Sequence, residues 1–108
     1  MKTDMIKAQL LMAIVADEFG VTVDELKGGD RRANTVIARR ILVYLCRDHL
    51  HMFYREIEDL VNKHFCALLS SYKYIEECLK DEDPKYDGLR SIVLTLVERF
   101  DKVCAKVE

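Results

Sequence analysis

Apolar residues recur three and four positions apart along most of this chain, and few residues are present that would interrupt the spacing. One proline and four glycines occur in 108 residues. Apolar residues at such intervals line one side of an α-helix and let that side pack on a core. Half of the residues are hydrophobic and a third are charged, as in an ordinary globular domain. The sequence therefore predicts an all-α fold: one domain over residues 1–108, built as a small bundle of about six helices.

Turn and capping residues set the expected limits of these helices. Thr22-Val-Asp-Glu25 has the form of a capping box and begins a short second helix, while Gly20 suits the residue just after the first. Asn34 is the expected N-cap of the long third helix. The expected helices cover about residues 4–19, 22–27, 34–51, 53–61, 65–80 and 86–107. Because only a short polar turn separates the fourth from the fifth, a helix–turn–helix is predicted over about residues 53–80.

Five arginines lie between Asp30 and Asp48 with no acidic residue among them, although the whole chain has a formal net charge of −2. Within the third helix, the apolar residues occupy one arc and the arginines another. A cationic stripe in fixed geometry attracts a polyanion even when the total charge does not. We therefore predict contacts with nucleic-acid phosphates, and expect Arg32 and Arg39 to be exposed. The stripe consists of Arg31, Arg32, Arg39, Arg40 and Arg47.

The alternative for the stripe is internal pairing with acidic side chains. The chain holds 19 acidic against 17 basic residues, so partners are available. An arginine that is paired in this way holds the fold together and is not free to contact a phosphate. The candidate partners are Asp17, Asp30, Asp48, Glu56 and Asp59.

Two stretches of the sequence resemble those of a known protein family. The first runs Ile14-Val-Ala-Asp-Glu-Phe-Gly-Val-Thr-Val-Asp-Glu-Leu-Lys-Gly28, and the second is Arg31-Arg32 followed by Val36-Ile-Ala-Arg-Arg-Ile-Leu-Val-Tyr-Leu-Cys-Arg47. They resemble the C-terminal DNA-binding domain of the bacterial replication initiator DnaA, whose consensus at the second stretch is approximately V-L-A-R-Q-I-A-M-Y-L-A-R. Glu56-Ile57 and Ile75-Glu-Glu fall where that family has E-I-G and K-I-E-E. The resemblance covers about residues 5 to 90.

This resemblance implies a fold of the DnaA C-terminal and Trp-repressor-like kind, double-stranded DNA as partner, and a part in replication initiation or its regulation. In that family a helix of the helix–turn–helix enters the major groove of a nonamer box, and a basic loop reaches the adjacent minor groove. By position, Arg31 and Arg32 would belong to the loop. The residues that would contact the DNA backbone are Arg39, Arg40, Arg47 and Lys63.

The start of the fifth helix departs from the family signature G-G-R-D-H-[ST]-T-V. This chain has Asn62-Lys-His-Phe-Cys-Ala-Leu68, one residue shorter. Phe65 replaces the base-reading His, and Cys66 with Ala67 replaces the hydroxyl pair, so most donors for direct base readout are missing. The remaining candidates for base readout lie at the start or on the outward side of this helix, which could also be an ordinary solvated face. They are His64, Ser70, Lys73 and Tyr74.

A different class of function is a degenerate initiator-type domain that mediates protein interaction or dimerisation and does not recognise a DNA sequence. The acidic net charge and the apolar Phe65-Cys66-Ala67 favour it. The last helix repeats apolar residues at alternating spacings of four and three, which could form a seam with a second copy or another protein. We favour packing of this seam on the chain's own core. Its residues are Leu89, Val93, Leu96, Phe100, Val103 and Val107.

Other classes of function lack their usual signals. No G-x-x-x-x-G-K-[ST] phosphate loop and no Ser/His/Asp or Cys/His arrangement is found, so we expect neither an enzyme nor a cofactor. The four cysteines are scattered, and no signal peptide or membrane-length apolar run occurs, which predicts a cytoplasmic protein. Cys46, His49 and His51 could be considered zinc ligands, but a second ligand cluster is missing, so no metal is expected.

Overall fold

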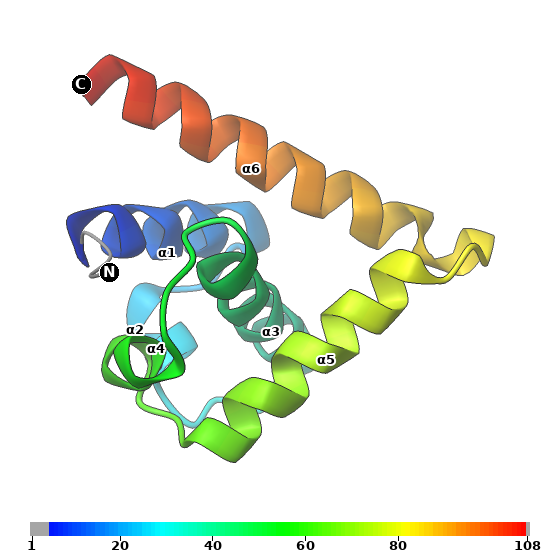
Figure 1. The fold of residues 1–108 in the computed structure, drawn as a ribbon, viewed down its shortest axis with the longest axis horizontal. Helices are drawn as coiled ribbons and strands as arrows, with labels where there is room; N and C mark the ends of the chain where they lie inside the picture. The colour runs from blue at the N-terminus through cyan, green and yellow to red at the C-terminus, as the bar shows by residue number, and fades with distance from the viewer. Residues whose placement is uncertain (1–4, 108) are drawn as a thin grey trace.

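The computed structural model describes residues 5–107, and in that range the chain forms α-helices and one 3₁₀ helix but no strand (Figure 1). The all-α class predicted from the sequence is therefore confirmed. The expected first helical residue, Asp4, lies outside the described residues. The helices are α1 (Met5–Phe19), α2 (Val23–Lys27), α3 (Ala33–Asp48), α4 (Tyr54–Val61), α5 (Phe65–Lys80), η1 (Pro84–Tyr86) and α6 (Asp87–Val107).

Several helix ends follow the local signals in the sequence. Gly20 adopts a φ of 65° just after α1, which favours glycine because it has no Cβ. At the start of α2, the Thr22 hydroxyl accepts from the Glu25 N–H at 3.0 Å, and the Glu25 carboxylate accepts from the Thr22 N–H at 2.8 Å. Asn62 ends α4 in the left-handed region with a φ of 55°. The predicted capping box, the predicted role of Gly20 and the predicted short turn before α5 are thus confirmed.

Both ends of α3 differ from the prediction. The helix begins at Ala33, so Arg32 is the N-cap residue, and the Asn34 amide instead donates to the Phe19 carbonyl at 2.6 Å. The helix ends at Asp48 and does not reach His51. There the Leu50 N–H bonds back to the Leu45 carbonyl at 3.1 Å and His51 takes a φ of 56°. This tight closing turn reverses the chain toward α4.

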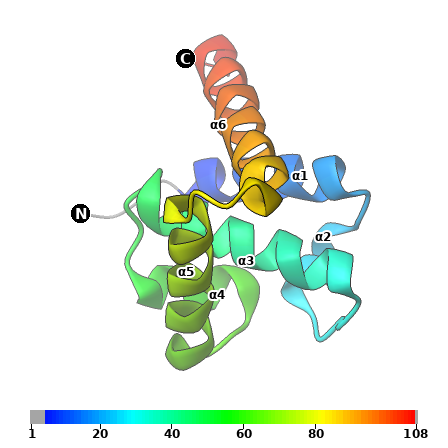
Figure 2. The ribbon, with the colours of Figure 1, turned by 90° about the vertical axis from the view of Figure 1, so that its right-hand side faces the viewer.

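α3 is the central element of the fold. It contacts α1, α2, α4 and α5, and the turned view shows it running behind α5 and below α1 (Figure 2). Ile41 and Leu42 are fully buried, as is Cys46. Burial of such side chains is the main favourable contribution to folding. α3 therefore acts as the platform on which α4 and α5 are placed.

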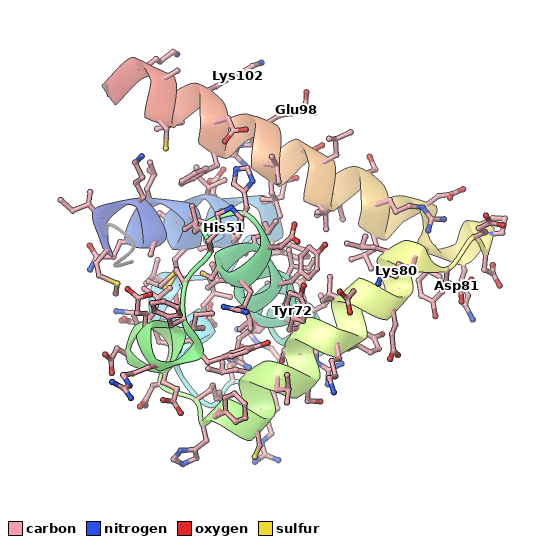
Figure 3. All side chains as sticks on the ribbon, in the orientation of Figure 1. His51, Tyr72, Lys80, Asp81, Glu98 and Lys102 are labelled. Atoms are coloured by element: carbon pink, nitrogen blue, oxygen red, sulfur yellow. The ribbon has the colours of Figure 1, made fainter. Side chains whose placement is uncertain are left out.

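α6 packs along α1, with Leu96 and Phe100 buried against the core. The Arg99 guanidinium ties the two helices by bonding Asp17 and Glu18 of α1, each at 2.9 Å. Glu98 and Lys102 lie on the outer side of α6 (Figure 3). The predicted packing of the seam on the chain's own core is confirmed for the residues from Leu89 to Val103, and the side chain of Val107 lies outside the description.

α4 and α5 form the helix–turn–helix, with residues 62–64 as the turn. One face of α5 packs on α3, where Tyr72 stacks on Tyr44 with ring centroids 5.3 Å apart (Figure 3). Leu68 and Ile75 are buried on this face. The opposite face of α5 is open to solvent. Within residues 5–107, no helix combines the length and the apolar character needed to cross a membrane.

Candidate nucleic-acid interface

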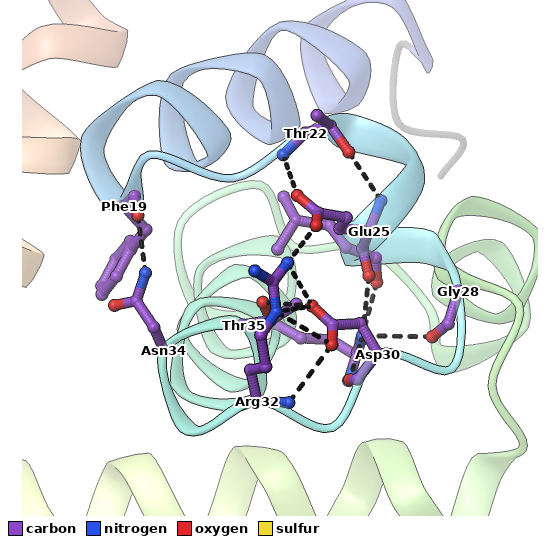
Figure 4. Close-up of polar contacts among 10 residues, drawn as sticks. Phe19, Thr22, Glu25, Gly28, Asp30, Arg32, Asn34 and Thr35 are labelled. Atoms are coloured by element: carbon purple, nitrogen blue, oxygen red, sulfur yellow. Dashed lines mark hydrogen bonds and ion pairs between the residues drawn. The ribbon is translucent and has the colours of Figure 1, made fainter.

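The loop between α2 and α3 is closed by a network of charged side chains (Figure 4). The Arg32 guanidinium donates to Asp30, with Nε 3.0 Å from Oδ2, and also contacts the Glu25 carboxylate. Asp30 further accepts from the Thr35 hydroxyl at 2.7 Å. These bonds from Arg32 and Thr35 hold the pKa of Asp30 well below its ordinary value, and the Asp30 carboxylate in turn raises the pKa of Arg32. Although Arg32 is exposed, its charge is offset by two carboxylates.

Arg39 is buried, with only 9% of the residue exposed. Its Nε donates to the Leu26 carbonyl at 2.7 Å and its Nη2 to the Glu25 carbonyl at 2.8 Å. Nη2 also reaches the carbonyls of Gly28 and Asp30 at 3.1 and 3.2 Å. Burial lowers the pKa of Arg39. The prediction that this side chain is exposed was wrong. Its guanidinium binds the backbone carbonyls of α2 and of the following loop and so stabilises the loop's conformation.

The helical wheel of α3 contains a signal for this burial that charge counting overlooks. Arg39 lies one turn from Thr35 and from Leu42 and Val43, all of which are buried. An arginine flanked in this way points toward the packed side of the helix. Its partners, however, are backbone carbonyls contributed by residues 25–30, and no side-chain pattern indicates them.

Arg47 is also engaged within the molecule. Its Nη1 donates to the Met52 carbonyl at 2.7 Å, and its guanidinium carbon lies 4.8 Å from the centroid of the Tyr54 ring. The first contact braces the turn between α3 and α4, and the second joins α3 to α4. Arg47 therefore stabilises the helix–turn–helix and is half-buried in doing so.

Of the six predicted phosphate contacts, three make neither a hydrogen bond nor an ion pair among the described residues: Arg31, Arg40 and Lys63. Arg40 and Lys63 line one hollow between α3 and α5, together with Ala67 and Ser71. Arg40 also lines the adjoining hollow with Arg31 and Tyr74. We call this continuous surface the α3–α5 groove. It includes Arg31, Val36, Arg40, Lys63, Ala67, Ser71 and Tyr74, and the largely buried Arg39 also lines it.

Tyr74 organises the middle of the α3–α5 groove. The Arg40 guanidinium carbon lies 4.6 Å from the centroid of the Tyr74 ring. Such a cation–π contact orients the guanidinium without neutralising its charge. Tyr74 also lines a shallow hollow on the outer face of α5 with Ser70, Lys73 and Glu77. The groove and the outer face of α5 therefore form one continuous surface.

The structure brings three of the four predicted base-reading residues together. Ser70, Lys73 and Tyr74 are exposed and share the hollow on α5. His64 stands apart as the exposed N-cap residue of α5, and its side chain makes no capping hydrogen bond. Glu77 faces the same hollow, so its carboxylate repels phosphates from the distal part of this face while leaving the first turns accessible.

The first turn of α5 is held by Glu58 and Tyr54, which no local sequence pattern singles out. The Glu58 carboxylate accepts from the Phe65 N–H at 2.9 Å, and an acidic group there complements the helix dipole. The Phe65 ring meets the Tyr54 ring edge to face, with centroids 5.1 Å apart. Phe65 remains 47% exposed, and Cys66 and Ala67 are exposed beside it.

The geometry does not suit zinc at Cys46. This side chain is fully buried, and burial raises the pKa of its thiol to about 12, whereas zinc binds the thiolate. The Nε2 atom of His49 lies 2.9 Å from Asp101 of α6. Among the described residues, no group of three or more potential metal ligands is present.

Comparison with known proteins agrees with this helical arrangement. The family described as the bacterial DnaA protein helix-turn-helix matches residues 8–75. The chain is 36% identical over 81 residues to the chromosomal replication initiator protein DnaA of Pelobacter propionicus, covering 74% of the chain and 18% of that protein. The corresponding protein of Geobacter metallireducens is 32% identical over 82 residues, covering 75% and 18%.

A further relative is the chromosomal replication initiator protein DnaA 2 of Protochlamydia amoebophila, 27% identical over 89 residues. That match covers 82% of the chain and 20% of the relative. The chain thus spans about a fifth of the length of the curated relatives it matches.

Proposed function

The chain belongs to the family of the bacterial DnaA helix-turn-helix, and from that premise we propose that it binds duplex DNA through α5 and the α3–α5 groove. In helix–turn–helix proteins the second helix lies in the major groove and its N-terminal residues meet the base edges. Here that helix is α5, and its outward face is open. The role that fits is that of a DNA-binding module in replication initiation or its regulation, without catalysis of its own.

The observation that carries the proposal is the convergence of Arg31, Arg40 and Lys63 on the α3–α5 groove. None of the three forms an ion pair among the described residues, so each can neutralise a phosphate without first breaking an ion pair. Phosphate contacts position a protein on the duplex and base contacts supply the specificity. The groove therefore supplies the anchoring, and Ser70, Lys73 and Tyr74 supply the remaining polar readout.

Three of the predicted phosphate contacts are no longer part of the proposal. Arg39 donates to four backbone carbonyls, Arg47 is held by Met52 and Tyr54, and Arg32 is paired with two carboxylates. Their role here is to fix the loop that presents Arg31 and the helix that presents Arg40. A site of three phosphate contacts predicts a slope near −3 in a log–log plot of affinity against salt.

The test is fluorescence anisotropy of labelled duplexes, one carrying an initiator-type box and one a scrambled sequence, at two ionic strengths. We expect binding to both at low salt, with a marked loss at the higher salt. Preference for the box would identify sequence-specific recognition, and equal affinity would indicate binding with altered specificity. Absence of binding to either duplex at low salt would contradict the proposal.

A protein-interaction module remains the second candidate. The exposed apolar residues Phe65, Cys66 and Ala67 favour it, as does Glu77 on the outer face of α5. The seam of α6 gives it less support, since Leu96 and Phe100 are already buried inside the molecule. Sedimentation of the free chain separates the two candidates: a dimer that fails to bind duplex DNA supports the interaction module.

A further inference from the structure

α4 carries a hollow on its solvent side that takes no part in the proposed DNA-binding surface. The hollow has a volume of about 620 Å³ and is lined by Phe53, Arg55, Glu56 and Asp59. None of these residues lines the α3–α5 groove or the hollow on the outer face of α5. α4 lies at the edge of the molecule, in contact with α5 (Figure 1). A hollow of this size is large enough to admit an aromatic side chain.

An aromatic ring stands at the rim of this hollow. Phe53 is the N-cap residue of α4 and is 53% exposed. Its backbone N–H donates to the Glu56 carboxylate at 2.9 Å, so the start of the helix is held by the backbone and not by the ring. Burial of such a ring in a contact with another protein is favourable. The rim therefore offers an apolar contact that the fold itself leaves largely in water.

Two opposite charges lie on the same rim. Arg55 and Asp59 are one turn apart on α4, and neither forms a hydrogen bond or an ion pair within residues 5–107. Opposite charges at this spacing often pair with each other, whereas here both remain available for an external contact. With Glu56, the rim holds one cation and two carboxylates. This balance does not suit a nucleic-acid phosphate.

The order of these charges along α4 is self-complementary. When a second α4 packs antiparallel to the first, about a twofold axis at the level of residue 57, Arg55 of each copy lies opposite Asp59 of the other. A twofold contact repeats every interaction, so two identical ion pairs form together. The Phe53 ring of each copy can then cover the other copy's hollow. The rim thus matches its own copy in both charge and apolar content.

We propose that Phe53, Arg55 and Asp59 bind a second copy of this chain in a symmetric α4–α4 dimer. The inference goes beyond the proposed function and does not rest on it. Tyr54 and Glu58, which contact the start of α5, lie about 100° farther around α4, so the dimer contact uses a different face. The dimer is weak, because the contact is small and each exposed ion pair contributes little. It presents two α5 helices, as helix–turn–helix dimers do.

The experiment is sedimentation equilibrium at low ionic strength, because salt screens exposed charges. A concentration series that reaches about 1 mM covers weak association. We expect the wild-type chain to dimerise reversibly. Arg55→Asp and Asp59→Arg each place like charges opposite one another, so each should weaken dimerisation roughly tenfold or more. Both suit the helix dipole, since Asp enters the first turn of α4 and Arg the last, and circular dichroism checks that each is folded.

The decisive measurement mixes the two variants in equal amounts. One copy then carries Asp at both positions and the other carries Arg at both, so each ion pair forms again between unlike copies. Association should return to about the wild-type level. Phe53→Ala, with the charges unchanged, should weaken dimerisation roughly tenfold. Arg31→Ala is the matched control: it removes an arginine from the groove and should dimerise like the wild type.

A wild-type chain that stays monomeric up to about 1 mM at low salt would overturn the inference. Dimerisation that persists unchanged in the folded Arg55→Asp variant would do the same, because it would place the contact on another surface. A mixture of the two charge variants that stays monomeric would also contradict the twofold contact. Each of these results leaves the proposed function intact, since anisotropy with duplex DNA tests that function separately.

Discussion

The loop before α3 and the α3–α5 groove both carry arginines, but only the groove leaves them available. At the loop, Arg32 is paired with Asp30 and Glu25, and Arg39, which reaches the loop from α3, is buried among four carbonyls. In the groove, Arg31 and Arg40 form no ion pair among the described residues. Adjacent arginines of one stripe therefore divide into those that hold the fold together and those that can bind a ligand.

The largest expected effect is a loss of stability when a structural arginine of the stripe is removed. Arg39→Ala is expected to lower the free energy of unfolding by about 3 kcal/mol, because it removes charged hydrogen bonds from four backbone carbonyls at a buried or partly buried site. Urea denaturation followed by circular dichroism measures the change. The matched control is the neighbouring Arg40→Ala, which loses a cation–π contact worth about 1 kcal/mol or less. Equal stability of the two variants would contradict the assignment of a structural role to Arg39 and a binding role to Arg40.

The affinity for DNA should depend on the arginines of the α3–α5 groove and not on Arg32. The double variant Arg31→Ala with Arg40→Ala is expected to weaken binding to every duplex by roughly tenfold or more at low salt. Because two phosphate contacts are lost, the log–log salt slope should also become shallower by about 1.8. Arg32→Ala, measured alongside by anisotropy, should change the affinity far less. A larger effect from Arg32→Ala would make Arg32, and not the cations of the α3–α5 groove, the main contact with DNA.

Acid pH provides a third comparison, because it acts on the loop network. Asp30 has its pKa lowered from an ordinary 3.8 by Arg32 and Thr35, so below about pH 4 the unfolded state binds more protons than the folded state. The network's contribution to stability is present above that pH and is lost as the pH falls. Urea midpoints measured from neutral pH downward should fall steeply for the wild type and less steeply for Asp30→Asn.

Asp59→Asn is the control for that experiment, since Asp59 is exposed and lies on α4, outside the network. Its urea midpoint should fall with decreasing pH as steeply as that of the wild type. An Asp30→Asn variant that loses stability with falling pH as steeply as the wild type would show that the Asp30 network does not contribute.

The smallest effects are expected on the outer face of α5. Ser70→Ala or Lys73→Ala should alter the sequence preference in a binding-site selection experiment, since each removes one polar group from the reading face. The change in overall affinity should be small for Ser70→Ala, which carries no charge. Selected sequences identical to those of the wild type would exclude these positions from base readout.

The helices were predictable because their signals are local. Apolar spacing, the Thr22 capping box and the positive-φ positions Gly20 and Asn62 are all encoded within a few residues, and α5 has the expected range. The start of α3 was missed because Asn34 bonds to Phe19 from a distant part of the chain, and its end was missed because Leu50 and His51 form a closing turn. Tertiary contacts of this kind do not appear in a local pattern.

The candidate site was predictable only in part, for the same reason. The exposed group Ser70, Lys73 and Tyr74 follows from helical periodicity, and the structure brings these residues together. The burial of Arg39 depends on backbone carbonyls 9 to 14 residues away in the sequence. The hydrogen bond from the Phe65 N–H to Glu58 depends on the turn before Phe65. Charge patterning located the stripe but did not separate its structural arginines from its available ones.

The most direct test follows the arginine side chains themselves. In an NMR titration with duplex DNA, the Nε–Hε signals of Arg31 and Arg40 should shift, whereas those of Arg39 and Arg32 should stay in place. Shifts confined to Arg32 and Arg39, with Arg31 and Arg40 unaffected, would contradict the assignment of DNA binding to the α3–α5 groove.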